Sequence, residues 1–219
     1  MSQPSPRPRP LRLTVSVVVP CAARHVPLLP TLVQKLAEQT SRPDQVVVAI
    51  SGVSRSPVLP LPTAICIPDR VARNAAQNRN RATPHVTSDV VLYQDADDVP
   101  HPQRVELVRA LFERFEIKHL MHAFATASNI AWSDQRYNFA YASQLLTRKR
   151  AYNYEPGLTN GNPAVATSLL RLGARWPEHL RVGEDVAFNI HACTLSDGKN
   201  ASLQLPLLLY RQHLSATSR

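Results

Sequence analysis

Three carboxylates stand together at the end of one apolar run of this sequence. In "VVLYQDADDVP", the side chains of Asp95, Asp97 and Asp98 follow directly on residues 90–93. Carboxylate oxygens are the ligands that Mg²⁺ and Mn²⁺ prefer. Acidic residues also stabilise helix N-termini, and Asp97 or Asp98 could simply cap the helix that the apolar stripe of residues 105–115 predicts. The spacing alone leaves the metal site and the helix cap open.

A second acidic pair lies in the other half of the chain. The segment "WPEHLRVGEDVAFNIHA" carries Glu184 and Asp185 just ahead of a stretch with helical spacing. A carboxylate at this place can act as a general base, or it can serve only as a partner of the helix dipole.

Buried strands are expected to position these acidic residues. The run "LRLTVSVVVP" predicts a β-branched strand closed by Pro20, "DQVVVAISG" a second strand ended by Gly52, and "TAICIP" a third. Helical spacing in "PLLPTLVQKLAEQT" and the segment "RVARNAAQNRNRA" predict helices between the strands. This alternation predicts an α/β fold, a mostly parallel mixed sheet flanked by helices, in which ligands bind at the carboxyl ends of the strands.

Length and composition favour one domain. The chain has 219 residues, 44% of them hydrophobic, enough for one substantial core. We expect residues 1–11 to be a disordered, basic, Pro-rich tail and residues 12–219 to form the domain. The tail lacks the apolar region of a secretory signal, and later apolar runs are too short to span a bilayer. Because Cys21, Cys66 and Cys193 form no CxxC pair, we expect a soluble, cytoplasmic protein.

The charge balance predicts an anionic partner. Lys and Arg number 25 against 16 Asp and Glu, for a formal net charge of +9. A positive field of this kind attracts nucleic acid, an anionic membrane surface or a phosphorylated small molecule alike. Aromatic residues do not interleave with the basic ones, so nucleic acid is not expected. The basic tail suggests loose peripheral contact with an acidic membrane face.

The stretch "NRNRATPHVTSDVVLYQDADD" resembles the donor half of family 2 glycosyltransferases with the GT-A fold. Arg79 and Asn80 stand at the place of the family's "ARN"-like segment, Asp89 at its acidic residue before the strand, and residues 95–97 at its DxD motif. A literal "ARN" at residues 72–74 is too far from the DxD to fit. The resemblance implies one GT-A-like domain with a donor half, residues 12–100, and an acceptor half, residues 101–219.

The resemblance also implies an activity. It implies a metal-dependent, inverting transfer of a sugar from a nucleotide-diphosphate sugar, by default a UDP-sugar, to a hydroxyl of a carbohydrate or glycolipid acceptor, in polysaccharide or glycoconjugate synthesis. By this resemblance Asp97, Asp95 and His213 would hold Mn²⁺ or Mg²⁺, and Asp185 would be the catalytic base. The residues expected to contact the donor are Pro20, Cys21, Ser51, Arg79, Asp95 and Ala96.

Residues around the acceptor are less sharply defined. Glu184 is expected to position the acceptor or to steady the helix start. Trp176 could offer its ring to a sugar face or pack in the core. The segment "TNGNPAVAT" should lead into an inner strand and place residues 160–162 near the donor sugar. Ser51 stands where the family usually has an Asp that recognises the nucleotide base. The nucleoside of the donor could therefore be guanosine or thymidine as well as uridine.

Two other classes of protein remain open. A sugar nucleotidyltransferase would also present carboxylates to a metal, but it would carry a Gly-rich phosphate loop after the first strand, and "PCAARHVPLLP" has no glycine. A basic, non-catalytic module that binds nucleic acid or an anionic membrane would use Asp97 and Asp185 only structurally.

Overall fold

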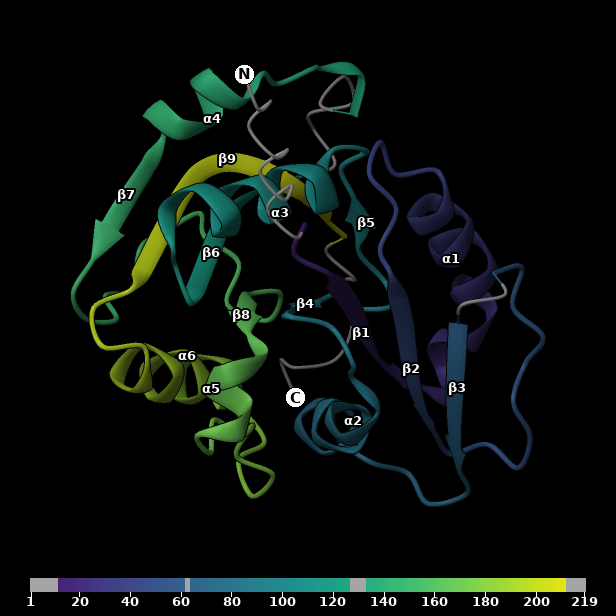
Figure 1. Cartoon of the computed structure of the whole chain (residues 1–219). Coiled ribbons are helices and arrows are strands. Elements are labelled where there is room, and N and C mark those ends of the chain that lie inside the picture. Colours follow the sequence, from purple (N-terminus) through teal and green to yellow (C-terminus); the bar gives the residue numbers. More distant parts are fainter. Residues whose placement is uncertain (1–11, 62–63, 127–132, 212–219) are drawn as a thin grey trace, which may run out of the picture.

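The described part of the chain forms a nine-stranded mixed sheet with helices packed on both of its faces (Figure 1). The computed structural model describes residues 12–61, 64–126 and 133–211. The strand order is β3-β2-β1-β4-β8-β6-β9-β5, and β7 pairs with β9. The strands are β1 (Val15–Ala22), β2 (Gln45–Ser51), β3 (Ala64–Asp69), β4 (Val90–Tyr93), β5 (Val99–Pro100), β6 (His119–Thr126), β7 (Leu146–Lys149), β8 (Ala164–Ala166) and β9 (Asn200–Tyr210).

Helices connect most of these strands. Two short 3-10 helices, Ala23–Leu28 and Thr83–His85, accompany them. The α-helices are α1 (Leu29–Ala37), α2 (Ala75–Ala82), α3 (Arg104–Phe115), α4 (Phe139–Gln144), α5 (Thr167–Arg171) and α6 (Glu184–Leu195). The predicted α/β fold with a mixed sheet is confirmed.

The first half of the chain forms the parallel part of the sheet. Strand β1 pairs in parallel with both β2 and β4, and β2 pairs in parallel with β3. Because side chains alternate along a strand, Val17 and Val19 face one core layer with α1 and α3, and Val18 faces the other with α2 and α6. Burial on both faces explains why these strands read as continuous apolar runs.

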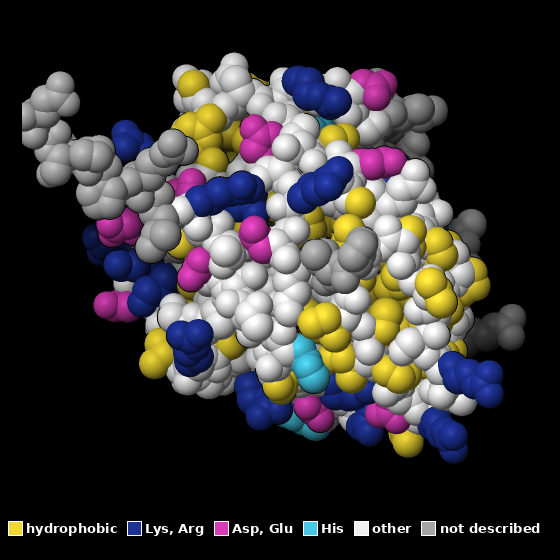
Figure 2. Space-filling model, turned by 45° about the vertical axis from the view of Figure 1, so that its right-hand side comes forward, with side chains coloured by type: hydrophobic (Ala, Val, Ile, Leu, Met, Phe, Trp, Pro, Cys, Tyr) yellow, Lys and Arg dark blue, Asp and Glu magenta, His cyan; other side chains and the backbone are white. Residues whose placement is uncertain are grey.

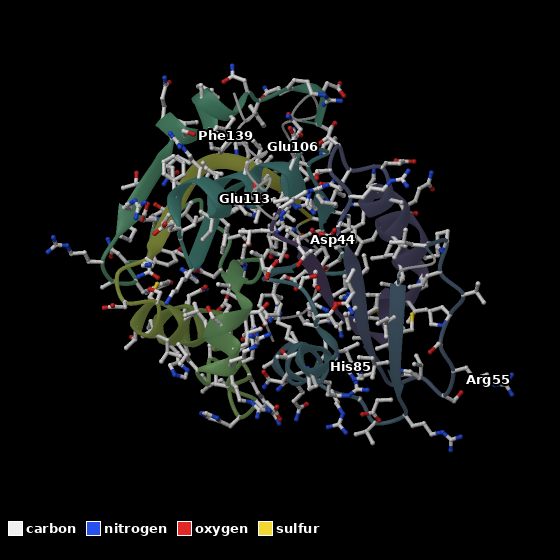
Figure 3. The ribbon with its side chains drawn as sticks, viewed as in Figure 1. Asp44, Arg55, His85, Glu106, Glu113 and Phe139 are labelled. Atoms are coloured by element: carbon white, nitrogen blue, oxygen red, sulfur yellow. The ribbon has the colours of Figure 1, made fainter. Side chains whose placement is uncertain are left out.

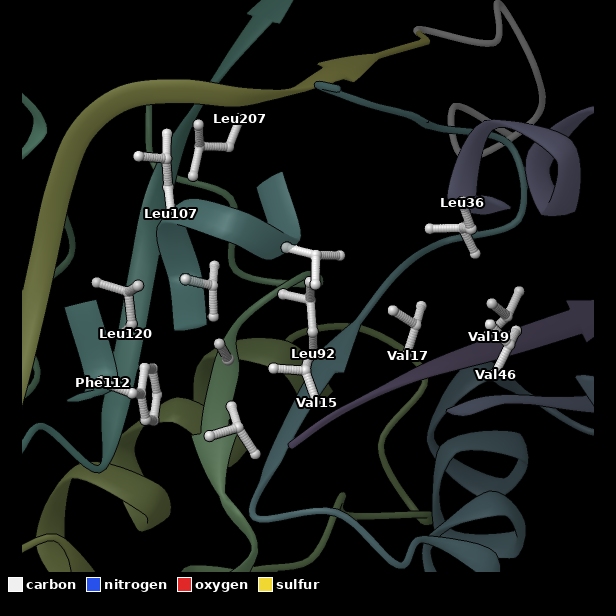
Figure 4. Close-up of a cluster of buried hydrophobic side chains, with 14 of the residues drawn as sticks. Val15, Val17, Val19, Leu36, Val46, Leu92, Leu107, Phe112, Leu120 and Leu207 are labelled. Carbon is white, nitrogen blue, oxygen red and sulfur yellow. The ribbon is translucent and has the colours of Figure 1, made fainter. Parts of the chain in front are cut away.

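The larger core layer lies between the sheet and helices α1 and α3. Figure 4 shows valines of β1 and β2 beside leucines of α1, α3 and the later strands. Apolar side chains from both halves of the chain therefore share one core, which fixes residues 12–100 against residues 101–211. Labelled members are Val15, Val17, Val19, Leu36, Val46, Leu92, Leu107, Phe112, Leu120 and Leu207.

Strand β1 is longer than predicted. It continues through Pro20 to Ala22, two residues beyond the proline that was expected to close it. Strand β4 pairs with β1 only as far as Val18, so Pro20 lies where that side of β1 has no strand partner. A proline is tolerated there because no ladder hydrogen bond is lost on that side. The extension carries the backbone of residues 20–22 out to the end of the sheet.

The second half of the chain adds antiparallel strands. Strand β8 lies between β4 and β6 and is antiparallel to both, so the segment "TNGNPAVAT" does lead into an inner strand, which lies within its last residues. The long strand β9 pairs in parallel with β6, through register shifts, and antiparallel with β5 and β7. These pairings bring residues 158–162 and 210–211 beside the loop that follows β4.

Polar contacts tie α3 to the beginnings of β1 and β2. Asp44, Glu106 and Glu113, labelled in Figure 3, lie along this junction. The Asp44 carboxylate accepts from the Val15 amide and from Arg109, both at 2.8 Å. Glu113 accepts from the Leu13 amide at 2.9 Å. These contacts fix the helix that follows the acidic loop.

Charges are mixed on the face shown in Figure 2, where Lys and Arg side chains are scattered with Asp and Glu among them. This face carries no continuous basic stripe of the kind that a nucleic-acid backbone favours. Among the described residues, no helix is both long and apolar enough to cross a membrane. The expectation of a disordered tail at residues 1–11 falls outside the described residues.

Candidate active site

The acidic loop lies at the carboxyl end of β4, beside the extended end of β1. Asp95 and Asp97 both line a hollow of about 460 Å³, together with Pro20, Cys21 and Ala96. Arginines from three separate segments line it too. The sheet end therefore gathers carboxylates and guanidinium groups around one space, where an α/β fold binds its ligands. The arginines are Arg24, Arg73, Arg79 and Arg181.

Asp95 is held from two sides. Arg79 Nη2 donates to its Oδ1 at 2.7 Å, and Asn162 Nδ2 donates to its Oδ2 at 3.2 Å. Its backbone amide donates to Asn162 Oδ1 at 2.7 Å. Burial raises the pKa of Asp95, and the charge of Arg79 opposes this rise. Asn162, expected near a donor sugar, fixes the backbone and carboxylate of Asp95.

Asp97 and Asp98 point into different surroundings. Asp97 is half-buried, and its Oδ2 lies 3.7 Å from His25 Nε2. Asp98 is buried and accepts from Asn162 Nδ2 and from the Arg211 amide, both at 3.2 Å. Burial, with the charge of Asp95 beside it, raises the pKa of Asp98 to about 8. Helix α3 begins only at Arg104, with no side-chain cap, so neither Asp97 nor Asp98 caps it.

A buried arginine holds the start of the acidic loop through hydrogen bonds. Arg104 is 1% exposed and donates to the backbone oxygens of Tyr93 at 3.0 Å and Asn162 at 2.9 Å, and also to the side chain of Gln94. Its Nε donates to His122 Nε2 at 3.0 Å. Burial lowers its pKa to about 9. Sequence reasoning missed Arg104, although a cation at the start of an apolar helical stripe was a visible signal.

Arg79 lies in the wall between this hollow and a second one. It is 2% exposed, and its Nη1 lies 3.7 Å from Glu184 Oε1. Arg79, Asp95 and Glu184 line both hollows. The literal "ARN" has a different role, because Asn74 caps α2 by accepting from the Gln77 amide at 2.8 Å. Asn74 also lines the first hollow.

The second hollow, of about 280 Å³, contains Asp185. Helix α6 begins at Glu184, and Gly183 precedes it with a left-handed backbone (φ 79°) that suits glycine. Asp185 accepts from the Val186 amide at 2.8 Å, so it also stabilises the helix start. The hollow continues past Asn160 and Gly161 to two aromatic residues, Phe124 and Tyr210, whose ring centroids lie 5.6 Å apart.

A buried amide joins the two walls of the second hollow. Asn189 is fully buried, and its Nδ2 donates to the backbone oxygens of Asp185 at 2.9 Å and Asn160 at 3.0 Å. Its Oδ1 lies 2.8 Å from His119 Nε2. Burial lowers the pKa of His119 to about 4, so near neutral pH the ring is uncharged and donates this hydrogen bond.

Two expected contacts differ in the structure. Trp176 is 2% exposed, with Arg79 over one face of its ring and Phe188 stacked at 4.0 Å. A ring covered in this way has no face for a sugar, so the structure supports its core role. Ser51 is 2% exposed and does not line the hollow, because its hydroxyl accepts from Asn78 and donates to the Arg73 oxygen. Ser51 is therefore not placed to read a nucleotide base.

Cys21 and His213 complete the predicted set. Cys21 is buried at the hollow, and burial together with the charge of Asp97 raises the pKa of its thiol to about 12. It is a neutral part of the wall. His213 lies outside the described residues. Among the described residues, no three His, Cys, Asp or Glu side chains form a group that could hold a metal by itself.

Comparison with solved structures defines the class of fold. S. aureus TarS 1–349 in complex with UDP superposes with a TM-score of 0.72 at 16% identity, covering 91% of this chain and 61% of that one. The same protein with UDP-GlcNAc gives 0.70 at 16% identity, covering 93% and 60%. Mannosyltransferase PcManGT from Pyrobaculum calidifontis, in complex with GDP-Man and Mn²⁺, gives 0.59 at 18%, covering 94% and 59%. The fold is that of the GT-A glycosyltransferases.

The family is shown by the sequence itself. The model of Glycosyl transferase family 2 matches residues 16–170, and the chain belongs to this family. The predicted resemblance to family 2 is thereby confirmed. A search of curated proteins found no match. The chain spans about 61% of the length of TarS 1–349.

Proposed function

We propose that this chain transfers a glycosyl group from a nucleotide-diphosphate sugar to an acceptor hydroxyl, with inversion at the anomeric carbon. The observation that carries the proposal is the pair of adjoining hollows, which share a wall of Arg79, Asp95 and Glu184. One hollow gathers arginines and the DxD carboxylates, and the other contains Asp185. Such a division suits a reaction in which the acceptor hydroxyl must lie next to the anomeric carbon of the donor sugar.

The first hollow suits an anionic donor. Arg24, Arg73, Arg79 and Arg181 line it against three carboxylates, those of Asp95, Asp97 and Glu184. Guanidinium groups recognise phosphate oxygens through paired hydrogen bonds. Family membership and the structural likeness to proteins with bound UDP, UDP-GlcNAc or GDP-Man support a nucleotide-sugar donor. Uridine stays the default base, with guanosine and thymidine open.

The donor set of the DxD loop fits a divalent cation. Asp95 and Asp97 offer carboxylate oxygens at one edge of the hollow, which suits Mg²⁺ or Mn²⁺ when diphosphate oxygens supply further ligands. His213 is proposed as a third protein ligand. A bound cation would neutralise the charge that develops on the leaving diphosphate.

Asp185 is the proposed base. The acceptor hydroxyl attacks the anomeric carbon from the side opposite the diphosphate, its proton passes to the Asp185 carboxylate, and the bond from carbon to phosphate oxygen breaks. The nucleoside diphosphate leaves with the electron pair of that bond. Asn189 supports this assignment because it fixes the backbone of Asp185 against Asn160 across the second hollow.

The acceptor is proposed to be a carbohydrate or glycolipid hydroxyl that enters the second hollow. Phe124 and Tyr210 give this hollow an aromatic side, and Asn160 and Glu184 give it polar groups. Flat aromatic rings with a polar rim suit a sugar ring, whose C–H face is apolar and whose edge carries hydroxyls. Glu184, which lines the second hollow, is proposed to contact the acceptor.

Release of nucleoside diphosphate tests the proposal. Purified protein is supplied in turn with UDP-, GDP- and TDP-sugars, a mixture of simple glycosides as acceptors, and either Mn²⁺ or EDTA. We expect metal-dependent release from one donor, which the substitution Asp185→Asn lowers about 100-fold or more while nucleotide binding persists. Release that is equal in Asp185→Asn would remove Asp185 from the reaction. No release from any donor would contradict the proposal.

A further inference from the structure

Arg79 is a buried cation whose hydrogen bonds fix only part of its guanidinium group. Its Nη2 donates to Asp95 Oδ1 at 2.7 Å and to the Gly161 oxygen at 3.2 Å. Its Nε and Nη1 are buried and make no hydrogen bond within the described part of the chain. A buried charge is costly unless its surroundings compensate for lost water. Something besides hydrogen bonds must therefore hold this side of the group, and the Glu184 carboxylate, 3.7 Å from Nη1, supplies only part of it.

An indole ring lies directly against that guanidinium. The Cζ atom of Arg79 lies 4.1 Å from the centroid of the Trp176 ring, within the range of a cation–π interaction. The opposite face of the ring stacks on Phe188, with centroids 4.0 Å apart and planes only 3° apart. The indole is thus fixed between a cation from α2 and an aromatic ring from α6, the helix that begins with Glu184 and Asp185.

Asn80, the residue after Arg79, fixes the backbone of Trp176. Asn80 Nδ2 donates to the Trp176 oxygen at 2.8 Å, and the Trp176 amide donates to Asn80 Oδ1 at 3.1 Å. Asn80 is 8% exposed. Helix α2 therefore contacts the Trp176 segment in two ways: Asn80 binds its backbone, and Arg79 lies against its ring. Together these two contacts fix the position of the guanidinium group.

We propose that Trp176 is a positioning residue for donor binding, which holds Arg79 in the wall between Asp95 and Glu184. The inference rests on the proposed function, since it assigns to Trp176 an effect on the nucleotide hollow. Trp176 touches no substrate in this account. It acts through Arg79, which keeps Asp95 in place on the donor side. A purely structural Trp176 would contribute only to the core that it shares with Val18, Leu169 and Phe188.

Nucleotide binding separates these two roles. UDP and GDP are titrated calorimetrically with Mn²⁺ into the wild type, Trp176→Met, Trp176→Phe and Leu169→Ala. Methionine fills space without a flat π face, phenylalanine keeps such a face, and Leu169 lies in the same core cluster. We expect about tenfold weaker binding by Trp176→Met, binding within about threefold of wild type by Trp176→Phe, and wild-type binding by Leu169→Ala, although Leu169→Ala lowers stability.

A double-mutant cycle with Arg79→Met gives the second readout. If Trp176 acts through Arg79, then Trp176→Met weakens binding in the parent and has no further effect once Arg79 is replaced. Should Trp176→Met not fold, the cycle is run with Trp176→Phe, whose smaller ring binds a cation less well, and the small loss should again depend on Arg79. Wild-type binding by the Trp176 variants, or equal losses with and without Arg79, would overturn the inference. A wild type that binds neither nucleotide would instead refute the proposed function, and the inference with it.

Discussion

At the scale of single residues, the conformation of the acidic loop depends on side chains from other segments as well as on its own aspartates. Asp95, Asp97, Asp185 and Arg79 could be proposed from the sequence because each stands in a short local pattern, and the structure brings them to two adjoining hollows. Asn162 could not be assigned its role, because its contacts with Asp95 and Asp98 join segments that are distant in sequence. Sequence patterns of this length report neighbours along the chain and not contacts across it.

Gly161 permits a close approach that any side chain would prevent. A Cβ atom at this position would lie 2.9 Å from Asp95 Oδ2 and 3.4 Å from Arg79 Nη2. Such crowding typically costs about 1–3 kcal/mol, and here it would displace a proposed metal ligand. We therefore expect Gly161→Ala to weaken Mn²⁺-dependent nucleotide binding about tenfold or more, as measured by calorimetric titration.

Gly157→Ala is the matched control. A Cβ atom at Gly157 would meet nothing within 4 Å. Because its φ is 87°, an alanine there would strain only the local backbone. It should lower stability without weakening nucleotide binding. Equal binding by Gly161→Ala and wild type would show that Asp95 tolerates displacement, and would count against its proposed role.

At the scale of elements, helix α2 carries Arg79 and Asn80, which contact Trp176 and so join the two halves of the chain. The sequence predicted a helix in this segment, and the structure places its start after Asn74, which forms a capping box with Gln77. The cap explains the literal "ARN" better than a donor contact does. The predicted end of β1 at Pro20 was wrong, because only pairing with β4 shows where a proline is tolerated.

Two helix caps offer a paired test of α2. Asn74 caps α2, and Asn138 caps α4 by accepting from the Tyr141 amide at 2.8 Å. Replacing such a cap by alanine costs about 1 kcal/mol. We expect Asn74→Ala and Asn138→Ala to lower the free energy of unfolding in urea by similar amounts, with weaker nucleotide binding only in Asn74→Ala. Weaker binding in both variants would mean that general loss of stability, and not the position of α2, controls the hollow.

At the scale of the whole molecule, local patterns sufficed for the parallel half of the sheet and for the existence of β8, but not for the strand pairings of the second half. Alternating strands and helices predicted β1 to β4, whereas the antiparallel pairings of β8 with β4 and β6 depend on residues far apart in the chain. The same long-range pairing brings the second hollow beside the first. Trp176 shows the limit clearly, because only its tertiary contacts decide between a core ring and a ring facing a ligand.

The stability of the molecule should fall in acid partly through buried His119. Its pKa is about 4 in the folded protein against an ordinary value of 6.5, since burial disfavours the charged ring. Between these values the unfolded chain binds a proton that the folded protein does not, so stability is lost as the pH falls from 6.5 to 4. This residue accounts for up to about 3 kcal/mol of that loss.

Urea unfolding at a series of pH values measures this contribution. His119→Gln keeps an N–H donor for Asn189 and cannot titrate. We expect the variant to lose less stability than the wild type between pH 6.5 and 4. The same pH dependence in both proteins would show that His119 is not the group responsible.

Asp95 and Asp97 are proposed to bind a nucleoside diphosphate together with a divalent cation. Calorimetric titration with UDP, GDP and TDP, with and without Mn²⁺, tests this proposal most directly when the wild type is compared with Asp97→Ala. We expect one nucleotide to bind the wild type only when Mn²⁺ is present, and Asp97→Ala to abolish this binding. Binding that needs no metal, or that Asp97→Ala leaves unchanged, would contradict the proposal.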